Sequence, residues 1–104
     1  MKITNLTSPK GNVIPNQFEI ETPNAIYFQS YDSIIAKKEN GNTFLDETYW
    51  NYSRTTSKYR SMFLGESTKE TQNKINSGVY TLVDLNSTPI AIGNTNNSTF
   101  KFFK

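Results

Sequence analysis

Apolar and polar residues alternate in several short segments of this chain. In Gln17–Thr22 the apolar residues Phe18 and Ile20 stand between polar neighbours, which is the period-two pattern of a half-buried strand. Asn40-Gly41 predicts a tight hairpin turn, because both residue types tolerate a positive φ. The same pattern predicts further strands over residues 25–29, 33–38, 43–45 and 79–85.

Two short helices are predicted between the fourth and fifth of these strands. Ser53 is a favourable N-cap for a helix over about 54–64, and Gly65 suits the left-handed residue that ends it. Ser67-Thr68-Lys69-Glu70 matches a capping box, which predicts a second helix over about 68–77.

Helical periodicity divides the first of these helices into two faces. Five residues are expected on the packed face: Thr55, Thr56, Tyr59, Met62 and Phe63. Arg54, Ser57, Lys58 and Ser61 fall on the solvent face, with Arg60 at the boundary. Tyr59 and Phe63 are therefore candidate core residues.

The order of elements predicts one α+β domain over residues 1–104, built on a mainly antiparallel sheet. Residues 1–16 carry Pro9, Gly11 and Pro15, which predicts a loosely ordered arm with at most a short strand over Lys2–Leu6. Residues 86–104 could form a closing hairpin from 88–93 and 98–104, or an extension of the domain.

Composition excludes several kinds of site. The 104 residues include no cysteine and no histidine, so disulfides, thiolate zinc sites and a histidine general base are excluded. Ser30, Ser33 and Ser53 therefore lack a histidine partner, and the spacing of the carboxylates brings no two of them to one site. Asp46-Glu47 is interpreted as a surface turn. We expect a protein that is not an enzyme and needs no cofactor or metal.

Charge and hydropathy narrow the class of partner. The net charge of +2 is smaller than that of most dedicated nucleic-acid-binding domains. No apolar run approaches the roughly 20 residues that a membrane span needs. A soluble protein of the bacterial cytoplasm, without membrane contact, is expected.

The segment Tyr49–Gly65 combines aromatic rings with cations and is the candidate partner-binding site. Its candidate residues are Trp50, Tyr52, Arg54, Lys58 and Arg60. Tryptophan, tyrosine and arginine are enriched at binding hot spots, and aromatic rings with cations can also contact nucleic acid. The competing interpretation is structural, with Trp50 filling the core and the cations solvating a helix face.

Two segments resemble a family of small uncharacterised proteins encoded by bacteriophages and related mobile elements. The first segment, within Tyr27–Lys38, shares Phe28, Gln29, Ser30, Tyr31, Ser33, Ile34, Ile35 and Ala36 with that family. The second shares Trp50, Tyr52, Ser53, Thr55, Thr56, Lys58, Tyr59, Arg60, Phe63 and Leu64. The resemblance covers roughly residues 17–85, and the stretch after Asn86 extends beyond it.

The resemblance implies a phage accessory protein that binds a host protein or protein–nucleic acid complex. Inhibition of a host defence system, such as CRISPR-Cas, is the activity it suggests. A nucleic-acid-binding accessory factor with weak nucleic-acid contact and a homo-oligomeric phage component remain the alternatives.

The first of the two segments also has a structural interpretation. Ile26 and Phe28 should face one side of the sheet, with Tyr27 and Gln29 on the other. Gln29 and Tyr31 could be buried and hydrogen-bonded, joining the bend at Ser30-Tyr31-Asp32 to the helix.

Overall fold

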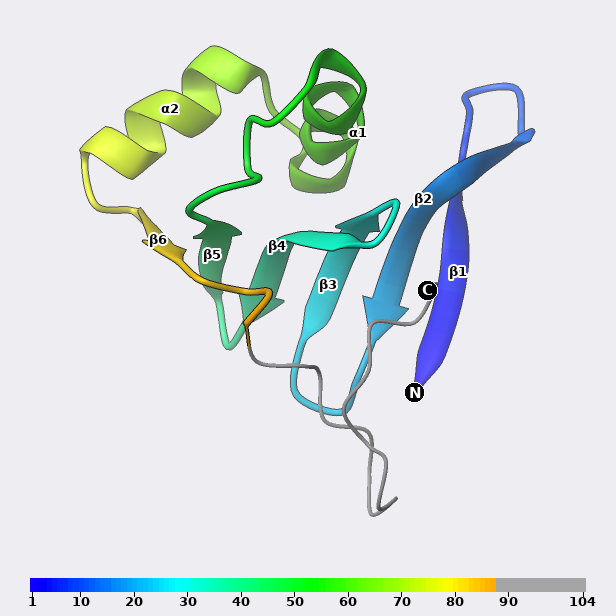
Figure 1. Cartoon of the computed structure of the whole chain (residues 1–104), viewed down its shortest axis with the longest axis horizontal. Coiled ribbons are helices and arrows are strands. Elements are labelled where there is room, and N and C mark those ends of the chain that lie inside the picture. Colours follow the sequence, from blue (N-terminus) through cyan, green and yellow to red (C-terminus); the bar gives the residue numbers. More distant parts are fainter. Residues whose placement is uncertain (88–104) are drawn as a thin grey trace.

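The computed structural model describes residues 1–87, which form one sheet covered on one face by two helices (Figure 1). The strands described in this part of the chain are β1 (Lys2–Thr7), β2 (Val13–Glu21), β3 (Ile26–Ser30), β4 (Ser33–Glu39), β5 (Asn42–Asp46) and β6 (Tyr80–Val83). Their order in the sheet follows their order along the chain. The predicted α+β class is confirmed. The suggested strands at 88–93 and 98–104 lie outside the described residues.

Strands β1 to β5 form an antiparallel meander, and β6 pairs with β5 in parallel. A parallel neighbour requires a long crossover, which the helices α1 (Arg54–Leu64) and α2 (Thr68–Asn76) supply. In Figure 1 both helices lie on the same side of the sheet. Helix α1 packs against β3 and β4, while α2 lies beside β6.

The turns and caps follow local residue chemistry. Asn40 and Gly41 have φ angles of 52° and 79°, as the predicted hairpin turn requires. The hydroxyl of Ser53 accepts a hydrogen bond from Thr56 N, and Gly65 takes a left-handed conformation with φ 71°. At the start of α2, Ser67 and Glu70 form both hydrogen bonds of the predicted capping box. Both helices thus begin where the sequence predicted.

The short strand suggested at Lys2–Leu6 is present as β1, but the loosely ordered arm predicted over residues 1–16 was wrong, because β1 pairs with β2, which begins at Val13. Lys2 to Asn5 pair with Glu21 to Phe18, and the register shifts before Thr7 pairs with Val13. Pro9 and Gly11 are confined to the intervening turn, so they do not interrupt β1. This edge strand is mostly exposed and is held by backbone pairing, which a search for buried alternating residues does not detect.

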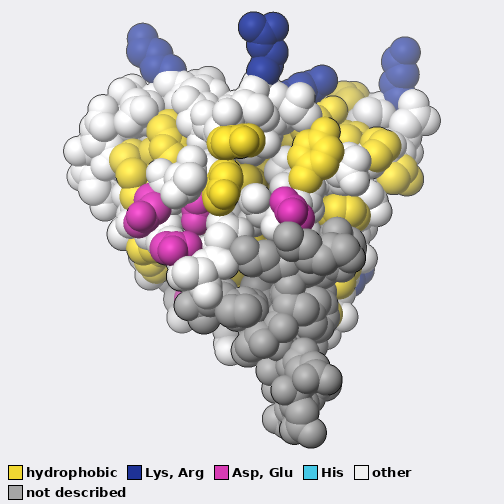
Figure 2. Space-filling model, viewed as in Figure 1, with side chains coloured by type: hydrophobic (Ala, Val, Ile, Leu, Met, Phe, Trp, Pro, Cys, Tyr) yellow, Lys and Arg dark blue, Asp and Glu magenta, His cyan; other side chains and the backbone are white. Residues whose placement is uncertain are grey.

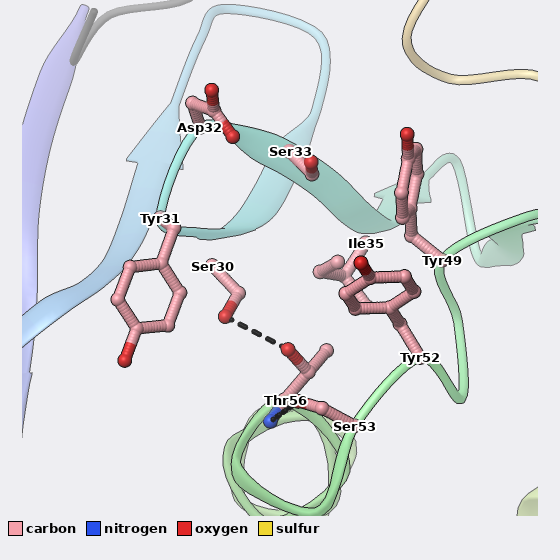
Figure 3. Close-up of a pocket in the computed structure, with 9 residues that line it drawn as sticks. All are labelled: Ser30, Tyr31, Asp32, Ser33, Ile35, Tyr49, Tyr52, Ser53 and Thr56. Atoms are coloured by element: carbon pink, nitrogen blue, oxygen red, sulfur yellow. Dashed lines mark hydrogen bonds between the residues drawn. The ribbon is translucent and has the colours of Figure 1, made fainter.

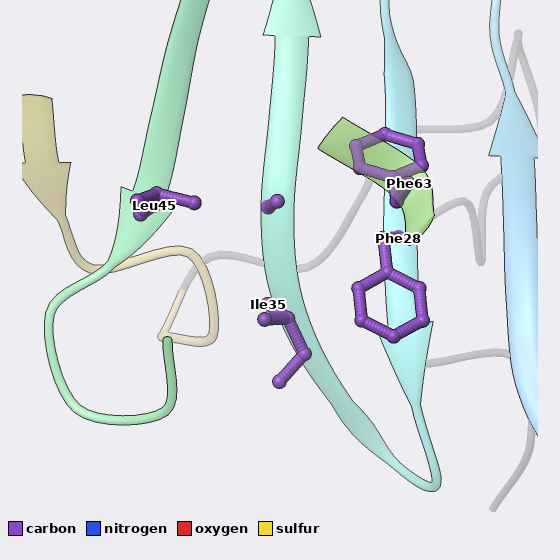
Figure 4. Close-up of a cluster of buried hydrophobic side chains, with 5 residues drawn as sticks. Phe28, Ile35, Leu45 and Phe63 are labelled. Carbon is purple, nitrogen blue, oxygen red and sulfur yellow. The ribbon is translucent and has the colours of Figure 1, made fainter. Parts of the chain in front are cut away.

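The main core lies between α1 and the sheet (Figure 4). Phe28, Ile35, Ala36 and Leu45 supply the sheet side, and Phe63 supplies the helix side. The rings of Phe28 and Phe63 stack with their centroids 5.8 Å apart. Ile26 packs against the same cluster, and Tyr27 packs on the opposite face, as the strand alternation predicted.

A bulge in β4 lets the consecutive apolar residues Ile34, Ile35 and Ala36 pack on both faces of the sheet. Gln29 pairs with Ile34 and Phe28 pairs with Ala36, so Ile35 is an extra residue between two pairs. Ile34 joins Ile20 in a second cluster, whereas Ile35 and Ala36 both join the core under α1.

Helix α1 is rotated relative to the predicted packed face. Its buried residues are Thr56, Arg60 and Phe63, and Tyr59 is partly buried. Thr55 and Met62, both predicted to pack, are exposed, and the exposed fraction of Met62 is 43%. The rotation occurs because Arg60, an arginine that sequence alone places at a boundary, points into the protein.

A buried carboxylate joins the two helices to β6. Glu66 lies between α1 and α2 and accepts hydrogen bonds from Thr71 Oγ1, Lys74 Nζ and Tyr80 Oη at 2.6 to 2.7 Å. Burial alone would raise the pKa of Glu66, but the hydrogen bonds from Lys74, Thr71 and Tyr80 outweigh it and lower the pKa below that of an ordinary glutamate. The ionised form therefore stabilises the fold.

Removal of the Phe28 ring should destabilise the protein strongly. We expect Phe28→Ala to lower the free energy of unfolding by about 3–5 kcal/mol, because it leaves a cavity beneath Phe63. Met62→Ala on the exposed side of α1 is the control and should change it by less than about 0.5 kcal/mol. Urea denaturation followed by circular dichroism measures both values.

Glu66 should make stability depend on pH in the acid range. Because its folded pKa lies below the unfolded value, its contribution is present above the unfolded pKa and is lost as pH falls through the folded pKa. Urea midpoints measured from pH 7 down to pH 3 should therefore fall more steeply for the wild type than for Glu66→Gln. Parallel curves would contradict this role.

Candidate functional site

Residues of the segments 27–38 and 49–65 meet at a surface pocket of about 280 Å³ (Figure 3). The β3–β4 bend and the start of β4 supply Ser30, Tyr31, Asp32, Ser33 and Ile35. The segment before α1 and its first turn supply Tyr49, Tyr52, Ser53 and Thr56. Residues about 20 positions apart in sequence thus form one site.

The β3–β4 bend holds Tyr31 in an unusual backbone conformation. Its φ of 56° lies in the left-handed region, which bulky side chains rarely adopt. Tyr31 N donates to Asn16 O at 2.7 Å, and Tyr31 O accepts from Gln29 Nε2 at 2.7 Å. Such a conformation costs about 1–3 kcal/mol and persists only where the surroundings impose it.

The prediction for Gln29 and Tyr31 was half right. Gln29 is fully buried and hydrogen-bonded through its Nε2 atom, but Tyr31 is exposed, with 53% of the residue accessible to solvent. The bend is joined to α1 by another pair, because the hydroxyls of Ser30 and Thr56 lie 3.1 Å apart in a hydrogen bond.

The second wall of the pocket depends on Asp46. One carboxylate oxygen accepts hydrogen bonds from Thr48 N and Tyr49 N, and the other accepts from Leu85 N. Asp46 is buried, so its interpretation as part of a surface turn was wrong. It fixes the chain where it leaves β5 and so positions the tyrosines that follow.

Tyr49 and Tyr52 form an aromatic pair at the pocket. Their ring centroids lie 5.2 Å apart in an edge-to-face arrangement with an interplanar angle of 67°. Tyr52 is 69% exposed. Figure 3 shows this pair on one side of the Ser30–Thr56 hydrogen bond and Tyr31 on the other. The site therefore has aromatic walls around a group of hydroxyls.

The structure separates the five predicted partner-binding residues. Tyr52 lines the pocket, and Arg54 and Lys58 are exposed on α1. Trp50 is half-buried and packs against the main core, as its structural interpretation required. Arg60 is fully buried, so its assignment as a partner-binding cation was wrong.

Arg60 is buried with both terminal nitrogens of its guanidinium hydrogen-bonded, whereas its Nε atom has no hydrogen-bond partner among the described residues. It donates to the backbone oxygen of Trp50 and to Thr68 Oγ1, and its Cζ lies 5.0 Å from the centroid of the Trp50 ring. Burial lowers the pKa of Arg60, and the negative charge of Glu66 opposes this shift. Helical periodicity places Arg60 between the packed face and the solvent face of α1, so the sequence does not indicate that it is buried.

Sequence reasoning missed Tyr31, Asp32 and Tyr49 as parts of one site. Tyr31 and Ser30 stood in the first family-like segment and Tyr52 and Ser53 in the second. Proximity of the two segments in the fold was the missing information.

The polar groups that line the pocket are hydroxyls and one carboxylate. Of its nine lining residues, all within the described part of the chain, Asp32 alone is charged. Within residues 1–87 no group of three or more His, Asp, Glu or Cys residues could hold a metal ion. Neither α1 nor α2 has the length and apolar character of a membrane-crossing helix. The lining suits hydrogen bonding and stacking with a bound group.

Comparison with known proteins gives one match. The model of a family of unknown function, DUF8033, matches residues 1–78. No curated protein and no solved structure matches the chain. The matched residues include every residue that lines the pocket.

The buried and exposed cations of α1 should behave differently on mutation. We expect Arg60→Ala to lower the free energy of unfolding by about 2–5 kcal/mol, because it leaves a cavity and removes the donors to Trp50 O and the Thr68 hydroxyl. Arg54→Ala and Lys58→Ala are matched controls on the same helix and should change it by less than about 0.5 kcal/mol. Equal urea midpoints for all three variants would contradict the buried role of Arg60.

Proposed function

This chain belongs to the DUF8033 family, and we propose that it is a non-enzymatic phage accessory protein that binds a host macromolecule. One observation carries the proposal: the two family-like segments converge on a pocket with exposed tyrosines. Exposed aromatic residues gathered at a hollow are typical of binding hot spots. The proposed site of action is the cytoplasm of the host bacterium.

The strained bend supports a binding role for this surface. Tyr31 keeps a costly backbone conformation while its ring is directed to solvent, where it contributes little to the core. Strain of this kind is concentrated at functional sites. A protein partner that packs against Tyr31 and Tyr52 would make use of both exposed rings.

A protein partner is favoured over nucleic acid by the distribution of charge. With Arg60 buried, Arg54 and Lys58 are the exposed cations that remain of the predicted patch. Figure 2 shows Lys and Arg side chains separated from one another along the upper edge of this face. Hydrophobic side chains lie below them, and several acidic side chains lie below the hydrophobic ones. Two phosphate contacts would give only weak binding with a shallow salt dependence.

The class of partner follows from the resemblance to phage accessory proteins. We propose a host defence complex, for example a CRISPR-Cas effector, as the first partner to test. Inhibition would then result from occupation of a surface on that complex, because the pocket contains no histidine or cysteine for chemistry on a substrate.

Loss of two exposed rings should abolish capture of the partner. Tyr52→Ala removes one ring, and Tyr31→Asn removes the other while retaining a residue that tolerates a positive φ. We expect tagged wild-type protein to recover a specific host protein from lysate and the double variant to recover at least about tenfold less. Quantitative mass spectrometry followed by titration calorimetry with the purified partner measures the difference.

Leu82→Ala, on β6 and outside the pocket, is the control and should leave capture unchanged. Recovery of the same partner by the double variant would place the interface elsewhere. A mobility shift with DNA or RNA that disappears in moderate salt would instead support the nucleic-acid alternative.

A further inference from the structure

We infer that the outer edge of β1 is a docking site, where an extended segment of a partner protein adds a further strand to the sheet. The segment carries a basic residue and an apolar residue two positions apart, and both face α1. This surface lies beside the C-terminal end of α1, whereas the pocket described above lies at its N-terminal end. Binding at the β1 edge goes beyond the proposed function and does not depend on it.

The outer edge of β1 has no strand neighbour within residues 1–87. In this part of the chain β1 stands at the end of the sheet and pairs with β2 alone (Figure 1). Such an edge presents N–H and C=O groups that can pair with another strand. The six residues of β1 include no proline and one charged residue, Lys2 at its start. Where the register shifts, Leu6 alone faces residues 14–17 of β2, so the irregularity belongs to β2 and β1 remains regular.

A groove of about 370 Å³ lies beside this edge, between β1 and the last turn of α1. Helix α1 packs against β3 and β4, and the groove lies where the sheet continues past the helix to β1. Five of the lining side chains carry the inference: Thr4 and Leu6 from β1, Glu19 from β2, and Met62 and Phe63 from α1. Pairing with an exposed edge supplies affinity, and a groove beside the edge supplies specificity for alternate side chains.

Strand alternation determines which positions of an added strand meet the groove. Thr4 pairs with Glu19, and Glu19 pairs with Phe28 beneath α1, so these side chains lie on the helix side of the sheet. Leu6 also packs against the core under α1. Residues opposite Thr4 and Leu6 on an added strand would therefore both face α1, two positions apart.

Glu19 places an unpaired negative charge in the groove. Its half-buried carboxylate has no hydrogen-bond or ion-pair partner within residues 1–87. Two cations share this side of the sheet, and neither forms an ion pair with Glu19. Lys2 stands opposite Glu21 in the strand register, and Lys38 Nζ donates to Phe63 O at 2.8 Å. A cation from a partner would supply the missing charge-assisted hydrogen bonds.

The position opposite Thr4 suits a long basic side chain. Neighbouring strands lie about 4.7–4.9 Å apart, so this position is roughly 10 Å from the backbone of Glu19, across Thr4. Thr4 is small and exposed, and the side chain of arginine or lysine can extend over it to the carboxylate.

The position opposite Leu6 suits an apolar side chain. Leu6 is half-buried and Phe63 is buried, while Met62 is exposed beside them. An apolar residue placed here would remove the side chain of Met62 from water, which stabilises the complex by about 25 cal/mol per Å² of apolar surface buried. The groove therefore selects a basic and an apolar residue separated by one position.

The test uses the full chain and a short peptide observed by two-dimensional ¹⁵N NMR. The probe is acetyl-Thr-Leu-Thr-Arg-Thr-Leu-Thr-amide, which has leucine two positions from arginine on both sides and so fits either strand direction. One comparison peptide replaces arginine with glutamate, a second replaces both leucines with serine, and a third is N-methylated at arginine and the threonine that follows it. N-methylation of two successive residues removes an N–H group that would pair with β1.

The probe should shift the amide signals of Lys2–Thr7, Glu19 and Met62. We expect at least about tenfold weaker binding of the glutamate and N-methylated peptides, and weaker binding of the serine peptide. Hydrogen exchange of β1 amides should slow when the probe is bound, because their N–H groups become paired.

Two variants locate the contacts in the groove. Glu19→Gln should weaken binding of the probe by about fivefold. Met62→Ala, which we expect to fold like the wild type, should weaken it by about threefold. Glu47→Gln is the matched control, because Glu47 is an exposed carboxylate after β5 that does not line the groove, and it should leave binding unchanged.

Equal binding of the arginine and glutamate peptides, full binding of the N-methylated peptide, or no shifts along β1 would each overturn the inference. Slow exchange of all β1 amides in the peptide-free monomer would also overturn it, because the chain itself would then cover this edge. Shifts along β1 that depend on protein concentration without peptide would assign the edge to a second copy of this chain instead. Partner capture that depends on Tyr31 and Tyr52 tests the pocket separately and would stand whatever the β1 edge binds.

Discussion

The packing of α1 on the sheet is the contact on which the rest of the structure depends. Phe63 stacks on Phe28 at the centre of the main core, and this contact holds the helix against the sheet. The first turn of α1 then lies against the β3–β4 bend, where Thr56 meets Ser30. The candidate pocket exists because this docking brings the two segments together.

The buried side chains of Arg60 and Glu66 fix how the two helices are arranged on the sheet. Arg60 ties α1 to the segment before it and to Thr68 at the start of α2. Glu66 ties the junction of the helices to Tyr80 on β6. Apolar packing alone is tolerant of small rotations, whereas buried charges stabilise only an arrangement that satisfies their hydrogen bonds. These contacts hold the surface at the N-terminal end of α1 in one shape.

The pocket combines a rigid base with exposed side chains. Asp46 fixes one wall through three backbone N–H groups, and the β3–β4 bend fixes the other through hydrogen bonds at Tyr31. Little conformational freedom of the backbone would then be lost when a partner binds, which favours affinity. Tyr31 is the first residue of the two-residue connection between β3 and β4, where a tight turn favours a positive φ, and its side chain adds little to the core.

Sequence alone determined the features that depend on near neighbours along the chain. Periodicity predicted β2 to β6 and their α+β class, and capping residues predicted the start of both helices. The tertiary structure decided which residues are buried against distant partners: it buried Arg60 and Asp46, turned Tyr31 outwards, and paired the mostly polar β1 with β2. Capping and alternation act over a few residues, whereas burial and pocket formation depend on contacts between segments that the sequence does not place beside one another.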